Sequence, residues 1–328
     1  MNNSRRKLIF CFAASIAAPR LILAQTDARP RLVAVVFNGS AHSDQIHLDA
    51  FSQGLRKYGY RDGGSVKLEV RYAEGRSERV AALIDEAVAR SPDVIVVEGS
   101  AASRAAKEAT STIPIVIARV GDPVELGLVE SLARPGRNIT GTSNMASAFV
   151  PKALEMFHEA LPQIHTVGVL VDPAMPVVPL IWTALEGTAK HLGIALERYD
   201  TNGPEELDRV LVAFARRRPR GLLVFPTPLL TAKREKIVDA LTRNRIPAML
   251  TIADGADLGG LMSYLPHTAE MWRNAATFVH RILQGAKPGD LPVEQATRFE
   301  LVINLKTAKA LGIKIPQSIL IRADRVIE

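Results

Sequence analysis

The chain has 328 residues, of which 47% are hydrophobic and 23% are charged, and this composition excludes a disordered or fibrous protein. Its length is sufficient for two domains of ordinary size. The formal net charge of +7 is high, but the first 24 residues contain four basic side chains and no acidic one. Subtracting these four from +7 leaves +3 for the remainder, so the charge gives no reason to expect a nucleic-acid partner.

Residues 1–24 have the pattern of a cleavable export signal. The basic segment Arg5–Lys7 precedes the apolar stretch Leu8–Ala18, and Ala24 is a small residue that suits cleavage. The apolar stretch is about half the roughly 20 residues that a membrane span needs. We therefore expect a cleaved, periplasmic protein, with the general and twin-arginine export routes both open. Cys11 is the only cysteine, so cleavage would leave no disulfide and no cysteine-based metal site.

A pattern of apolar stretches followed by turn residues occurs twice along the chain, with an offset of about 130 residues. The stretches are Leu32–Phe37, Val94–Val97 and Ile115–Ala118 in the first half, and Val167–Val171, Gly221–Phe225 and Ala248–Ile252 in the second. Segments with helical spacing of apolar residues, such as Asp44–Tyr58 and Pro179–Leu192, lie between them. This alternation predicts an α/β fold with two doubly wound, parallel-sheet lobes.

Three segments of the chain are candidates for crossings between the two lobes. Asn138–Ser143 is predicted to be a strand that leaves the first lobe, and Leu261–Tyr264 and Gly289–Val293 are candidates for the other two crossings. The predicted boundaries are 31–142 plus 266–293 for the first lobe, and 143–265 plus 294–328 for the second. Three crossings would form a hinge of parallel segments, suited to rigid-body closure on a small molecule.

The candidate binding residues follow the predicted strands, because ligands of such sheets bind beyond the carboxyl ends of the strands. This rule selects Asn38, Gly39, Glu98, Gly99, Ser100, Gly121 and Asp122 in the first lobe, and Asp172, Pro226, Thr227 and Asp254 in the second. Tyr264 lies near a predicted crossing, and its ring could pack against a ligand side chain.

Several of these residues have a structural alternative. Gly99 and Ser100 open a predicted helix, whose free N–H groups could hold a carboxylate, but Ser100 could also serve only as a helix cap. Asp122 could pair with a ligand ammonium or cap the helix that follows it. Asp172 is its analogue in the second lobe, and Asp254 could simply be a turn residue.

The sequence contains none of the common catalytic or cofactor-binding motifs. It lacks the His-Glu-x-x-His zinc motif, the Gly-x-Ser-x-Gly nucleophile elbow, the phosphate-binding loop and the Gly-x-Gly-x-x-Gly fingerprint. His42 and His47 lie near an expected helix start, and we interpret both as facing solvent. We therefore predict a protein that binds without reacting, is not an enzyme, and uses no cofactor and no metal.

Several segments, in the same order, resemble one exported family. They are Val120–Val124, Leu132–Gly141, Gly259–Tyr264, Gly285–Pro288, Leu291–Gln295, Phe299–Ala308 and Ile321–Glu328. From Arg31 onward the chain resembles the ABC-transporter substrate-binding proteins of the tryptophan/tyrosine-transport type. The resemblance implies a periplasmic-binding-protein fold of type I, with two lobes and a three-segment hinge. It also implies delivery of a small molecule, often an amino acid, to an ABC permease in the inner membrane.

By position, the resemblance implies particular roles for five residues. Gly99 and Ser100 would form a carboxylate cradle, Asp122 would be the ammonium partner, and Thr142 and Ser143 would make polar contacts at the hinge.

The chain departs from the family pattern in the second lobe. It has Leu265 and His267 after its Ser-Tyr motif, no aromatic residue in Thr251–Asp254, and Asp172 where an Asn is common. The cargo therefore stays open. Two alternatives to transport also stay open, namely a ligand-sensing accessory protein for a membrane sensor and an exported enzyme on the same fold.

Overall fold

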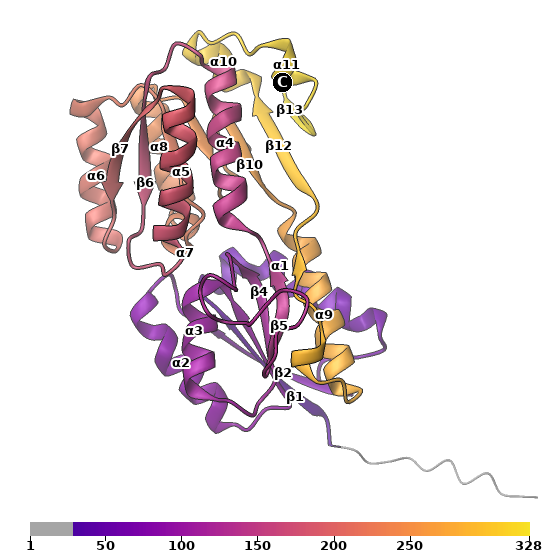
Figure 1. Cartoon of the computed structure of the whole chain (residues 1–328). Helices are drawn as coiled ribbons and strands as arrows, with labels where there is room; N and C mark the ends of the chain where they lie inside the picture. Colours follow the sequence, from indigo (N-terminus) through magenta and orange to yellow (C-terminus); the bar gives the residue numbers. More distant parts are fainter. Residues whose placement is uncertain (1–28) are drawn as a thin grey trace, which may run out of the picture.

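The computed structural model describes residues 29–328, and the expected export signal lies outside the described residues. Within this range the chain folds into two α/β lobes, each built around its own sheet (Figure 1). No helix between residues 29 and 328 is long and apolar enough to cross a bilayer.

The first sheet has six parallel strands in the order β11-β5-β4-β3-β1-β2. They are β1 (Arg31–Phe37), β2 (Val66–Tyr72), β3 (Val94–Glu98), β4 (Ile115–Val120), β5 (Ile139–Ser143) and β11 (Glu294–Gln295). The helices of this lobe are α1 (Ala41–Lys57), α2 (Val80–Ala89), α3 (Gly99–Ala109) and α9 (Thr268–Leu283), with 3-10 turns η1 (Ser77–Arg79) and η2 (Pro288–Asp290). Val33 and Val35 pack on the side of α1 and α9, whereas Ala34 and Val36 pack on the side of α2 and α3. Because both faces of β1 are covered, the strand needs the unbroken apolar stretch that the sequence supplies.

The second sheet has seven strands in the order β13-β12-β10-β9-β8-β6-β7. They are β6 (Thr166–Val171), β7 (Ala195–Asp200), β8 (Leu222–Val224), β9 (Ala248–Leu250), β10 (Met262–Pro266), β12 (Phe299–Asn304) and β13 (Arg325–Ile327). The helices are α4 (Ala146–Ala160), α5 (Val178–Leu192), α6 (Pro204–Arg217), α7 (Pro228–Ala232), α8 (Arg234–Asn244), α10 (Leu305–Leu311) and α11 (Gln317–Leu320).

This sheet differs from the all-parallel expectation at one pair, because β10 and β12 are antiparallel. The reason lies in the hinge. The chain leaves the second lobe after Pro266 and re-enters it at Phe299, and these two residues are register partners. Strands that leave and enter a lobe at the same point must run in opposite directions.

Three connections join the lobes, as Figure 1 shows. Asn144–Met145 lies between β5 and α4, His267 lies between β10 and α9, and 296–298 lies between β11 and β12. β11 pairs with β5, so residues 294 and 295 belong to the first sheet. The lobe boundaries given above stay a proposal. The three connections lie within a few residues of these boundaries, although the proposal assigned residues 294 and 295 to the second lobe.

Strand β4 has an irregularity that matters for the cleft between the lobes. Its pairing with β5 shifts register between Ile117 and Val120, and Arg119 has a φ of 55°. Gly141 of β5 has a φ of 139°, and a Cβ there would overlap the backbone of Ile117. Glycine therefore allows the two strands to approach each other closely beside the bulge. The bulge redirects the side chain of Arg119.

Candidate functional site

A cleft of about 50 Å³ lies between the lobes, at the carboxyl ends of strands from both sheets. Its first-lobe wall is mostly polar and consists of Asn38, Gly39, Ser43, Asp44, Glu98, Gly99, Ser100, Arg119, Gly121 and Asn144. Its second-lobe wall is mostly apolar and consists of Ala146, Met175, Val177, Pro226, Pro228, Thr231 and Ala232.

The two lobes touch each other around this cleft. A Cβ on Gly121 would lie 2.7 Å from Cγ2 of Val177, and a Cβ on Gly75 would lie 3.6 Å from Cβ of Ala232. These contacts and the small volume of the cleft describe a closed arrangement of the lobes.

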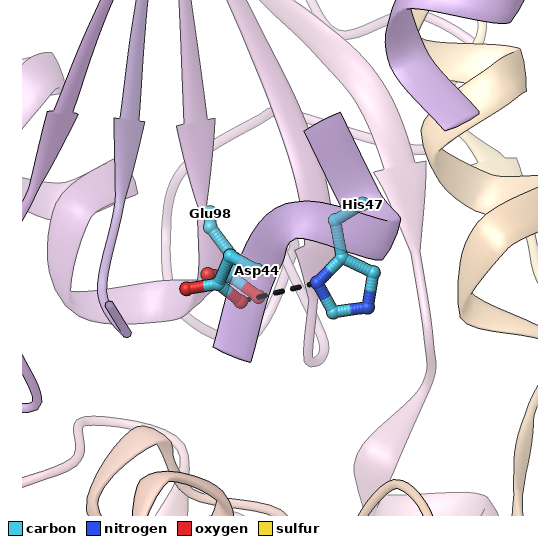
Figure 2. Close-up of side chains that lie close together, drawn as sticks. All are labelled: Asp44, His47 and Glu98. Carbon is cyan, nitrogen blue, oxygen red and sulfur yellow. Dashed lines mark hydrogen bonds and ion pairs between the residues drawn. The ribbon is translucent and has the colours of Figure 1, made fainter. Parts of the chain in front are cut away.

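A buried polar cluster lies at the first-lobe wall (Figure 2). Ser40 caps α1 through a capping box with Ser43, which fixes the first turn and places Asp44 toward the cleft. Gly39 leaves room for this carboxylate, because a Cβ at Gly39 would overlap Oδ2 of Asp44. His47 lies one turn further along α1, and its Nδ1 is 3.1 Å from Oδ1 of Asp44.

Burial sets the protonation of this pair. It raises the pKa of Asp44 to about 6, although the charge of Arg119 acts in the opposite direction. Burial lowers the pKa of His47 to about 4, so the imidazole is neutral at neutral pH. A neutral ring can donate from Nδ1 to Asp44 and accept at Nε2 from the hydroxyl of Thr268, which is 3.2 Å away on α9.

Glu98 ends β3 and is the second buried carboxyl of the cluster. Arg119 donates from a terminal guanidinium nitrogen to Oε1 of Glu98 at 2.8 Å, and the backbone N–H of Asn38 donates to Oε2 at 3.3 Å. Burial, with the nearby charge of Asp44 as the next cause, raises the pKa of Glu98. Two buried carboxyls thus lie near one guanidinium, which is hydrogen bonded to Glu98.

The cluster also has the composition of a metal site. One ligand atom from each of Asp44, His47 and Glu98 lies within 4.8 Å of the others. However, both ring nitrogens of His47 already have hydrogen-bond partners, and Arg119 is paired with Glu98. A divalent ion would have to break the bond between His47 and Asp44 and would lie beside the guanidinium charge, so the donor set fits a metal poorly.

Three residues that line the cleft each have one buried polar atom without a hydrogen-bond partner among the described residues. These atoms are Oδ1 of Asn38, Oδ1 of Asn144 and Nε of Arg119. Asn38 and Asn144 are only 4% and 7% exposed. Because an unsatisfied buried polar group costs about 1–3 kcal/mol, such atoms in a cleft indicate positions where a ligand completes the hydrogen bonding.

The predicted binding residues that line the cleft together are Asn38, Gly39, Glu98, Gly99, Ser100, Gly121 and Pro226. The hinge residues make local contacts instead, since the Thr142 hydroxyl accepts from the backbone N–H of Arg119 at 3.3 Å.

Two further predicted residues also bond locally near the hinge. The Ser143 hydroxyl accepts from the N–H of Met145 at 3.2 Å. Both oxygens of Asp122 accept from Ser147, one from its N–H at 3.0 Å and one from its hydroxyl at 2.5 Å. Asp122 thus caps the start of α4, and its pairing with a ligand ammonium stays a prediction.

Of the predicted residues of the second lobe, Pro226 lines the inner cleft, whereas the others lie outside it. Asp172 lines an outer extension of the space between the lobes, and burial raises its pKa to about 6. Thr227 caps α7, Asp254 is 3.7 Å from Arg234, and the ring of Tyr264 stacks on Phe299.

Sequence reasoning missed four residues of the site, namely Asp44, His47, Arg119 and Asn144. The interpretation of His47 as solvent-facing is wrong, because its side chain is 2% exposed and α9 covers it. The signal that was available for Asp44 is the Asn-Gly-Ser turn after β1, which brings the first turn of α1 to the strand end.

Comparisons with known proteins place this geometry in context. A protein named "Tyrosine-binding protein" from Clostridioides difficile is 26% identical over 265 residues, which cover 80% of this chain and 76% of that protein. A solved conserved domain protein from Vibrio cholerae is 26% identical with a TM-score of 0.85, over 91% of this chain and 100% of that one. A solved ABC domain from Streptococcus pneumonia, in complex with L-Trp, has 24% identity and a TM-score of 0.84, with the same coverage of both chains.

These structural matches confirm the two-lobed fold of the type I periplasmic binding proteins. The sequence profile of the family described as "ABC transporter substrate binding protein" matches residues 33–327. This family consists of binding proteins, and the prediction that the chain is not an enzyme is confirmed with it. The chain belongs to the family of ABC transporter substrate-binding proteins, as the motifs in its sequence indicated.

Proposed function

We propose that the protein is exported to the periplasm, closes its lobes on an amino acid or a related small molecule, and delivers it unaltered to an ABC permease in the inner membrane. One observation carries this proposal. The cleft is built from strand-end residues of both lobes and contains buried polar atoms that lack partners among residues 29–328. The names of two relatives support the class of cargo, since one is a tyrosine-binding protein and the other holds L-Trp.

Four residues are proposed to contact the cargo directly. Gly99 and Ser100 open α3, an 11-residue helix whose first N–H groups can receive a carboxylate at the cleft. Asn38 and Gly39 lie beside them at the end of β1. Asp172 is a further candidate for a larger cargo that extends into the outer space between the lobes.

The energetics of closure are compatible with this role. Shifting the lobes from mostly open to mostly closed needs about 5.5 kcal/mol of differential binding. Hydrogen bonds to charged groups contribute about 1.5–3 kcal/mol each, so a few contacts made only in the closed form are sufficient.

The proposal is tested with the mature protein, whose mass should show an N-terminus near Gln25 if the export signal is removed. Its melting temperature is measured against a broad panel of amino acids and other small metabolites. We expect at least one compound to raise the melting temperature. That compound should also stimulate ATP hydrolysis by the cognate permease in vesicles, only when the binding protein is present. A panel with no stabilising compound, or a stabilising compound that is chemically changed, would contradict the proposal.

A further inference from the structure

We propose that the inner cleft recognises a small, non-aromatic solute through a cationic nitrogen, with Asp44 as the principal partner of that group. The inference rests on the proposed function and narrows its class of cargo. It differs from what the names of the relatives suggest, because those proteins are associated with aromatic amino acids.

The first argument is the charge of the polar wall. Asp44 and Glu98 are 4% and 6% exposed, and Arg119 is hydrogen bonded to Glu98. The groups that bond Asp44 carry no positive charge. They are a histidine, which is neutral at neutral pH, the backbone N–H of Gly39, and the hydroxyl of Ser43, which is 3.4 Å from Oδ2. Arg234 of the second lobe is nearby but is 3.7 Å from Asp254. A cationic group in the cleft would supply the positive charge that Asp44 lacks.

The second argument is the hydrogen bonding of the two asparagines. The amide nitrogen of Asn38 donates to the carbonyl of Glu98, which leaves Oδ1 of Asn38 as the free end of this side chain. Oδ1 of Asn144 is likewise buried and without a partner among the described residues. Two acceptors and a carboxylate around one cleft match the N–H donors of an ammonium or guanidinium group. Nε of Arg119 remains as a donor for an acceptor elsewhere on the solute.

The third argument is the opposite wall. The second lobe contributes Met175, Val177 and four further aliphatic or proline side chains, and none of the residues that line the inner cleft is aromatic. In this closed arrangement the cleft is small, about 50 Å³. An indole or phenol ring has no aromatic stacking partner here, whereas a short aliphatic chain can pack against this surface.

The chemical class is tested by the melting temperature of the wild-type mature protein. The probes are compounds with a cationic nitrogen, each paired with a hydroxyl isostere. The pairs are L-alanine with L-lactate, putrescine with 1,4-butanediol, and ethanolamine with ethylene glycol; agmatine, L-tyrosine, L-tryptophan and Zn²⁺ are tested alone. We expect cationic compounds to raise the melting temperature and their isosteres to have no effect. If an isostere, an aromatic amino acid or Zn²⁺ gives the largest shift, this inference is overturned. A largest shift with an isostere or with an aromatic amino acid would leave the proposed function intact. If no probe shifts the melting temperature, the result contradicts both this inference and the proposed function.

The role of Asp44 is tested by calorimetry on the cationic probe that gives the largest shift. Asp44→Asn preserves the size of the side chain and removes its charge, and we expect at least a tenfold loss of affinity. Asp93→Asn is the matched control, because Asp93 accepts from the backbone N–H of Leu32 in the same lobe and does not line the cleft. The control should bind within threefold of wild type. Equal affinities of wild type and Asp44→Asn would refute the assignment, and the melting temperatures of both variants verify that they are folded.

Discussion

Gly121 offers the sharpest test of lobe closure. A methyl group at this position would lie 2.7 Å from Cγ2 of Val177, which belongs to the other lobe. In the open form the two residues separate, so Gly121→Ala should penalise only the closed form. Overpacking of this kind costs about 1–3 kcal/mol, which corresponds to a loss of affinity of roughly 5- to 140-fold.

The assay is calorimetric titration with the compound that stabilises the wild-type protein. Val177→Ala removes the clashing methyl groups, so the double variant Gly121→Ala with Val177→Ala should regain part of the lost affinity. Recovery should be incomplete, because the new methyl also lies 3.2 Å from Cβ of Ala146. Wild-type affinity in Gly121→Ala, or a double variant as weak as the single one, would refute the closed geometry described here.

Three further predictions concern stability. Asp122→Ala should lower the free energy of unfolding by about 1–2 kcal/mol, because both carboxylate oxygens bond Ser147 at the start of α4; an unchanged denaturation midpoint would argue against this cap. Gly141→Ala should lower the free energy of unfolding by more than about 1 kcal/mol, because the φ of 139° and the nearby backbone of Ile117 exclude a Cβ. An unchanged free energy of unfolding would be inconsistent with the β4–β5 geometry. The folded-state pKa of Asp44, about 6, lies above the usual 3.8, so its contribution to stability is present below pH 4 and is lost as the pH rises through 6. Asp44→Asn should therefore be more stable than wild type at pH 7 by about 1–3 kcal/mol and equal to it below pH 4; a pH-independent difference would disprove this.

The central strands could be predicted from the sequence because burial on both faces leaves a distinct signal. Leu32–Phe37 and Val167–Val171 coincide with β1 and β6 to within one residue. The edge strands β2 and β7 were missed, since each pairs on one side only and mixes apolar with charged residues, as in Ala195–Asp200. Such a segment has no continuous apolar stretch to distinguish it from a surface loop.

The site was predictable only where it follows the strands. Asn38 and Gly99 lie at strand ends, so the position of the cleft followed from the fold class. Asp44 and His47 lie on a helix, and their environment comes from β3, β4 and the distant Thr268 of α9. A residue 221 positions away in the sequence buries His47, and a bulge redirects Arg119. Neither effect leaves a local pattern in the sequence.

Small-angle scattering of the mature protein, with and without its stabilising compound, tests the central claim most directly. If the two lobes clamp a solute, the radius of gyration should fall on saturation, and the scattering of the loaded protein should match the closed arrangement in Figure 1. An identical profile at saturating concentrations, with binding verified by calorimetry, would show that the solute is held without closure and would contradict the account.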